Sequence, residues 1–131
     1  MNAPGPYSFS ITRGKDFERK FVFKSQTTGV PIPLTGLKAR AQFRTLAGQF
    51  GTTTASTLLL ELTDGAGIEV TDADAGEVTM TLTVANTLTL CPTNTKTKVA
   101  WEFELYDDGV DPETVQGGLI GKVTINPETV R

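Results

Sequence analysis

The sequence predicts an all-β protein: a single β-sandwich of two packed antiparallel sheets with about seven to eight short strands. Three observations support this. Roughly one residue in six is threonine, which suits a pleated sheet and weakens helices. Apolar and polar residues alternate with a period of two in several segments, and no segment shows a helical period. Turn-forming residues recur about every eight to twelve positions.

The length and composition indicate one folded domain. The chain has 131 residues, which is too short for two independent cores. We expect an N-terminal arm with a first short strand at residues 1–13 and the β-sandwich domain at residues 14–131. Its charged fraction of 21% and net charge of −3 are ordinary for a folded protein. The longest apolar run, residues 58–60, is far too short to cross a bilayer, so we expect no membrane insertion.

The first clear strand is predicted at residues 16–24. Phe17, Phe21 and Phe23 fall on one face of it, and that face is expected to point inward. Arg19 interrupts this apolar face. We therefore expect Arg19 to lie near a sheet edge or to pair with a carboxylate.

A proline-containing segment follows at residues 30–34. Pro31 and Pro33 lack backbone donors, so the segment is predicted to cross between sheets or to run along an edge. Residues 37–44 then alternate again and predict a strand with one basic, solvated face.

Residues 46–57 are rich in glycine, threonine and serine and show no periodic pattern, which predicts an exposed loop. Phe50 lies within this loop. It is either a lid over the core or a contact for a partner.

The second half of the chain predicts further strands at residues 58–62, 68–70, 77–84, 98–106 and 119–125. The alternation in residues 98–106 places Trp101 on the inner face of a central core strand. Residues 85–90 are compatible with one helical turn capped by Asn86, but the Cys91-Pro92 pair stops it. We expect no full helix there.

The sequence offers no catalytic machinery. It contains no histidine, the commonest general base and a frequent metal ligand. The acidic residues fall in turns or on solvated faces, which does not predict a catalytic carboxylate pair. The Asp72-x-Asp74-x-Gly76 pattern resembles the start of a calcium loop, but Thr83 stands where a bidentate glutamate is required. We therefore predict no enzyme activity, no catalytic residue, no metal site and no cofactor.

Charge and cysteine content narrow the partners and the compartment. Twelve Lys and Arg stand against fifteen Asp and Glu, without a basic cluster, so nucleic acid is not an expected partner. Residues 1–6 carry no export signal, and Cys91 cannot form an internal disulfide. We expect synthesis in a cytoplasm, with Cys91 as a small buried apolar residue.

The order of segments resembles that of small phage structural proteins with an immunoglobulin-like domain, of the type found in tails and baseplates. The resemblance covers about nine-tenths of the chain, and no single segment carries it alone. The segments, in order, are Gly14-Lys15-Asp16, Pro33-Leu34-Thr35-Gly36, Leu62-Thr63 through Gly67-Ile68 to Asp72-Ala73-Asp74-Ala75-Gly76, Ala100-Trp101-Glu102-Phe103-Glu104-Leu105, Gly118-Leu119-Ile120-Gly121-Lys122-Val123 and Thr129-Val130-Arg131.

This resemblance implies an immunoglobulin-like sandwich in a virion component: a tail, baseplate or fibre-attachment module that binds other virion proteins and copies of itself. It implies location in the virion and brings no catalytic residues. A head decoration protein and a carbohydrate- or receptor-binding sandwich are the alternatives. A hydrolase that uses Asp72 and Asp74 is a third reading. The expected partner contacts are Tyr7, Pro31, Pro33, Phe50 and Tyr106.

Overall fold

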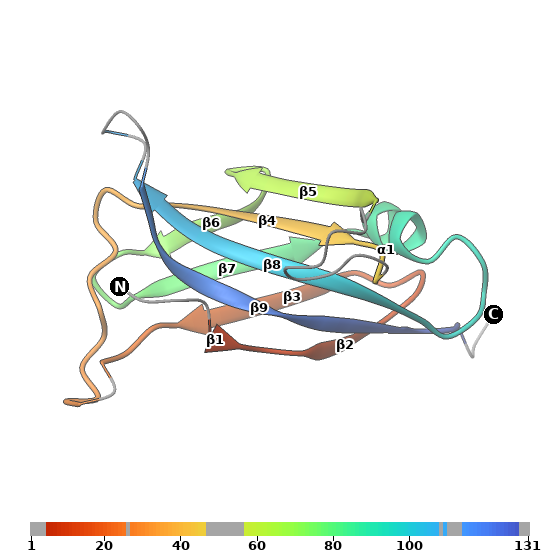
Figure 1. Ribbon diagram of the computed structural model, residues 1–131, viewed down its shortest axis with the longest axis horizontal. Coiled ribbons are helices and arrows are strands. Elements are labelled where there is room, and N and C mark those ends of the chain that lie inside the picture. Colours follow the sequence, from red (N-terminus) through yellow and green to blue (C-terminus); the bar gives the residue numbers. More distant parts are fainter. Residues whose placement is uncertain (1–4, 26, 47–56, 108, 110–113, 129–131) are drawn as a thin grey trace.

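The computed structural model describes residues 5–25, 27–46, 57–107, 109 and 114–128. These residues are almost entirely β-structure, so the all-β prediction is confirmed (Figure 1). The elements are β1 (Gly5–Pro6), β2 (Phe9–Thr12), β3 (Phe17–Val22), β4 (Lys38–Arg44), β5 (Leu58–Asp64), β6 (Gly67–Asp72), β7 (Glu77–Leu82), α1 (Val84–Leu90), β8 (Thr97–Asp107) and β9 (Thr114–Asn126).

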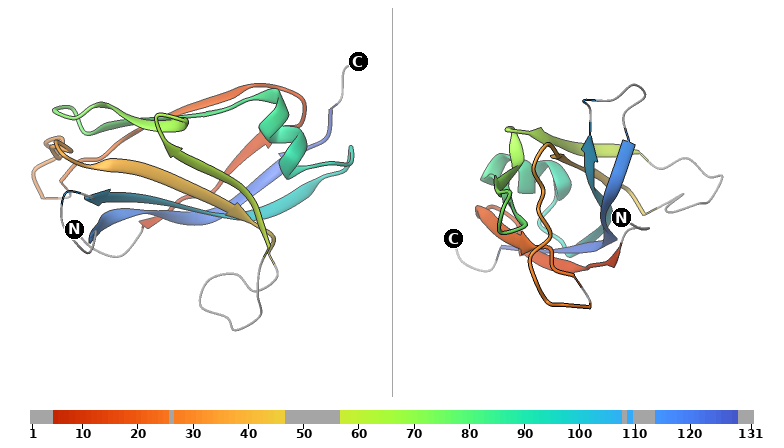
Figure 2. Two further views of the ribbon diagram at one scale, coloured as in Figure 1. Left: turned by 90° about the horizontal axis from the view of Figure 1, so that it is seen from above. Right: turned by 90° about the vertical axis from the view of Figure 1, so that its left-hand side faces the viewer.

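The strands form two facing layers. One layer has the order β9-β8-β4-β5, with β1 and β2 on the outer side of β9, and the other has the order β3-β7-β6. A short β5–β6 pairing joins the layers, and in the end-on view of Figure 2 the strands surround the core almost completely. The first layer matches strands G-F-C-C′ of a variable-type immunoglobulin domain and the second matches strands B-E-D. The chain is therefore an immunoglobulin-like β-sandwich.

The pairing departs from the predicted antiparallel scheme at three places. β1 and β2 both pair parallel with β9, and β5 pairs parallel with β6 over two residues. The N-terminal segment is therefore part of the sheet from Gly5 onward, and Phe9 and Ile11 lie in the core. Alternation along a strand shows which face is buried, but it does not show which strand lies beside it or in which direction.

An aromatic cluster joins the two layers at the centre of the core. Trp101 is buried, as the alternation predicted. From β3, the Phe21 ring lies 6.0 Å from the Trp101 ring and 5.7 Å from that of Phe103, centroid to centroid. In antibody domains a disulfide joins the corresponding B and F strands. Here aromatic packing between β3 and β8 takes that place, and Cys91 is a free, buried thiol.

The helix α1 corrects the expectation that residues 85–90 form no full helix. It runs for seven residues, because Thr83 and Asn86 form a capping box that satisfies the first backbone donors. The cap is thus Thr83, and Asn86 is its third-position partner rather than the cap itself. Within the described residues, no helix has the length and apolar composition to cross a membrane.

Thr87 anchors this helix to the turn between β2 and β3. It is fully buried, its Oγ1 donates to the Val84 carbonyl, and the same oxygen accepts from the Gly14 amide at 3.0 Å. Replacing Thr87 with valine leaves that amide without an acceptor, so we expect the free energy of unfolding to fall by about 1–2 kcal/mol. Thr89→Val, at an exposed threonine of the same helix, is the control and should change it by less than about 0.5 kcal/mol. Urea denaturation of both variants measures the difference, and equal stabilities would contradict the anchoring role.

Candidate functional site

The outer edge of β3 leaves backbone groups unpaired. β3 pairs with β7 on one side only, and the strand order ends there. The Phe23 amide donates to Gly76, in register with that pairing. Because alternate residues of a strand point their backbone groups to opposite sides, those of Glu18, Lys20 and Val22 face away from β7. Among the described residues, no hydrogen bond uses these outward-facing groups.

Side chains rather than hydrogen-bonded strands close the seam between β3 and the N-terminal strands, which lie side by side in Figure 1. The Phe9 and Phe17 rings stack with centroids 5.3 Å apart. The Arg19 guanidinium lies 5.2 Å from the Phe17 centroid and donates a hydrogen bond to the Tyr7 hydroxyl. The expectation that Arg19 lies near an edge is confirmed. Within the described residues its partners are the Tyr7 hydroxyl and the Phe9 and Phe17 rings rather than a carboxylate.

Beyond Arg19 the seam opens into a shallow groove, hereafter the β3 groove, with a volume of about 370 Å³. Aromatic and aliphatic side chains and two lysines line it: Tyr7, Lys20, Phe21, Val22, Phe23, Lys24 and Leu119. Within the described part of the chain neither lysine forms an ion pair. The groove therefore combines an apolar floor, unpaired backbone groups and positive charge.

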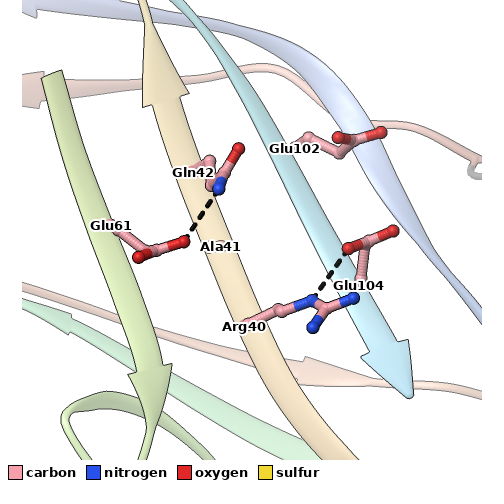
Figure 3. A pocket seen from close by; sticks show the side chains of 6 residues that line it. All are labelled: Arg40, Ala41, Gln42, Glu61, Glu102 and Glu104. Carbon is pink, nitrogen blue, oxygen red and sulfur yellow. Dashed lines mark hydrogen bonds and ion pairs between the residues drawn. The ribbon is translucent and has the colours of Figure 1, made fainter. Parts of the chain in front are cut away.

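A second depression, the polar basin, lies on the outer face of β4, β8 and β5 (Figure 3). Arg40 Nε and Glu104 Oε1 form an ion pair at 2.9 Å, and Gln42 Nε2 donates to Glu61 at 2.8 Å. Both pairs join neighbouring strands. The basin is about 170 Å³ and most of its polar groups are already engaged with one another.

Glu102 is the exception in this basin, because no hydrogen bond to its carboxylate is present among the described residues. Partial burial raises the pKa of Glu102, and the nearby charge of Glu104 raises it further, whereas Arg44 and Arg40 act in the opposite direction. The charged form of Glu102 therefore disfavours the folded state.

Replacing Glu102 with glutamine should raise the urea midpoint at pH 7. A carboxyl whose pKa is higher in the folded state binds more protons folded than unfolded, so its effect on stability becomes less favourable as pH rises above the ordinary value of 4.5. The gain should therefore shrink below about pH 4, where the carboxyl is protonated in both states. Glu69→Gln, on the exposed face of β6, controls for the loss of one negative charge. A gain that is equal at both pH values, or equal in the control, would contradict this reading.

In the described residues no three His, Cys, Asp or Glu side chains group to hold a metal ion. The Cys91 thiol is buried and donates to the Thr93 carbonyl at 3.0 Å, which places it in the core and away from both depressions.

The residues expected to contact partners lie in different places. Tyr7 is half-buried against Phe21 and Trp101 and lines the β3 groove. Tyr106 lies under the Arg40 guanidinium, 4.2 Å from ring centroid to Cζ.

Pro31 bridges to Lys24, next to the β3 groove, in the crossing segment that the sequence predicted. Pro33 is exposed in the same segment. Phe50 falls outside the described residues. The structure thus brings Tyr7 and Pro31 to the same end of β3 and places Tyr106 on β8, across the sandwich.

Sequence reasoning did not single out Lys20, Lys24 or Leu119, which complete the groove. The alternation of residues 16–24 did place both lysines on the solvated face. Their pairing with an open edge depends on strand order, which alternation does not reveal.

No protein-family model matches the chain, and no curated protein matches it. Among solved structures it is similar to the N-terminal domain of phage TP901-1 ORF48, with a TM-score of 0.43 and 10% identity over 96% of this chain and 90% of that one. It is also similar to the NK cell receptor Nkp44, with a TM-score of 0.43 and 10% identity over 94% of this chain and 98% of that one.

Proposed function

We propose that this protein is a non-enzymatic structural component of a bacteriophage particle, a tail, baseplate or fibre-attachment module that binds neighbouring virion proteins. The observation that carries the binding role is the unpaired edge of β3 beside an apolar, positively charged groove. An exposed sheet edge is a template for pairing with another chain. The order of segments in this sequence resembles that of phage structural proteins, and this resemblance supports placing both this protein and its partner in a virion.

A sugar-binding role has less support in the described residues. Sugar-binding platforms use the exposed faces of aromatic rings. The Tyr106 ring is covered by Arg40 on one side, and the Tyr7 ring packs against Phe21 and Trp101. A binding surface for protein is therefore the better fit to these side chains.

Light scattering over a range of protein concentrations tests the proposal, followed by co-sedimentation with particles of the phage that encodes the chain. We expect a discrete oligomer, incorporation into particles, or both. A strict monomer that stays in the supernatant at every concentration would contradict a virion role. Binding on a glycan array in that case would favour the carbohydrate-binding alternative.

A further inference from the structure

We propose that the β3 groove receives an extended segment of a neighbouring virion protein, with alternating apolar and acidic residues, which adds to β3 as an extra strand. This inference rests on the proposed function, because it names the surface and the kind of partner through which that function operates. Three features of the groove carry it: its free backbone groups, the alternation of its side chains and its unpaired positive charge.

The backbone provides the attachment. Lys20 and Val22 each point one N–H and one C=O away from β7, and the Arg19–Tyr7 contact closes the seam on one side of them. An incoming strand lies about 4.8 Å from its neighbour and bonds to such groups. Because the open stretch runs from Lys20 to Lys24, it suits a segment of about four to five residues.

The side chains of β3 specify the pattern of the incoming segment. Phe21 and Phe23 point toward the floor, where Tyr7 and Leu119 also contribute, while Lys20, the exposed Val22 and Lys24 lie in the opposite phase. Residues on an added strand alternate between the same two faces and interact with their cross-strand neighbours. Apolar residues therefore face the aromatic floor, and acidic residues face the lysines.

The lysines also make the edge selective. Positively charged side chains on an edge strand discourage pairing with an apolar or basic strand. The lysines repel a basic strand but attract an acidic one. This difference in affinity between the two kinds of strand gives the edge its specificity.

Synthetic peptides test this inference on the intact protein. The first probe is an acetylated, amidated octapeptide of alternating valine and glutamate, and the second has lysine in place of glutamate. Two further versions carry N-methyl groups on the valines or on the glutamates, so that one of them lacks the donors that face β3. Binding is followed by the NMR shifts of backbone amides in the ¹⁵N-labelled protein at low salt.

We expect the acidic peptide to shift the amides of β3 from Lys20 to Lys24 and to bind about tenfold more tightly than the lysine peptide. The N-methylated version that lacks the backbone donors facing β3 should bind much more weakly than the unmethylated acidic peptide. Shifts centred on the polar basin, equal affinity for the acidic and basic peptides, or unchanged affinity for both N-methylated versions would each overturn the inference, as would no binding by the acidic peptide.

A charge-reversed variant and a matched control complete the test. The double variant Lys20→Glu/Lys24→Glu should reverse the preference and select the lysine peptide. Lys98→Glu/Lys122→Glu changes the charge equally at exposed positions of β8 and β9, and should keep the wild-type preference. Reversal in both variants would show that net charge, rather than the groove, selects the peptide.

Particle incorporation separates this inference from the proposed function. If wild-type protein enters particles and Lys20→Glu/Lys24→Glu enters equally well, the groove is not the docking surface although the virion role stands. If the wild-type protein is a strict monomer and does not enter particles, the virion role fails whatever the peptides do. If the wild-type protein enters particles and Lys20→Glu/Lys24→Glu does not, the result supports both the virion role and the β3 groove as the docking surface.

Discussion

Replacing Gly121 with alanine is expected to lower the free energy of unfolding by about 3 kcal/mol and to loosen the N-terminal strands from β9. A Cβ at this position would lie 2.0 Å from the Tyr7 carbonyl oxygen and 2.7 Å from its carbon. That oxygen cannot move aside freely, because it accepts the Trp101 Nε1 hydrogen at 2.8 Å. The Tyr7 amide is also fixed, since it donates to Ile120. The added methyl group therefore displaces backbone at a junction of three strands.

Urea denaturation measures the loss, and hydrogen exchange locates it. We expect the Gly121→Ala substitution to speed hydrogen exchange at the amides of Tyr7 and Ile11 more than at the amides of β7. Gly109→Ala is the control, because its nearest contact among the described residues is the end of the half-buried Asp107 side chain at 3.1 Å. This control should change stability by less than about 0.5 kcal/mol. Equal stabilities of the two variants would show that the N-terminal strand shifts without cost.

Replacing Trp101 with alanine should cost about 3–5 kcal/mol, the range for removing a large buried aromatic side chain. Trp101 is 1% exposed and contacts aromatic rings from both layers, among them Phe21 and Phe43. It also holds the Tyr7 carbonyl through its indole N–H. Its loss therefore leaves a cavity between the sheets together with an unsatisfied acceptor.

Two companion variants separate these contributions. Trp101→Phe keeps a ring but removes the donor, and should cost about 1–3 kcal/mol. Tyr106→Ala removes an aromatic side chain from the outer face of the same strand and should cost only about 1 kcal/mol, mainly through its Arg40 contact. Circular dichroism and urea unfolding report all three. A Tyr106→Ala loss as large as that of Trp101→Ala would contradict the central role of the inner face.

Much of the fold could be predicted because burial follows alternation. Trp101 and Phe21 both lie in the core, on the faces that period-two patterns assigned to them. The edge position of Arg19 was also predictable, because a charged residue interrupts an otherwise aromatic face. These inferences need only the geometry of one strand.

Strand order and the helix required information beyond a single strand. The helix α1 contains two threonines and has little intrinsic helical tendency, so its capping box and the buried Thr87 contact decide its formation. The candidate site depends on strand order in the same way. Lys20 and Leu119 are about a hundred positions apart in the chain and meet only because β9 and β3 flank the same seam.

The parallel pairing of β2 with β9 sets the order of events during synthesis. Phe9 pairs with Val123, about 110 residues later in the chain. At translation rates of about 5–20 residues per second, β2 waits roughly 5–20 s for its partner strand. During that interval Phe9 and Ile11 lack the strand that completes their shelter, while β3 to β7 are already available to pair. Pairing of β2 with β9 therefore cannot precede translation of β9.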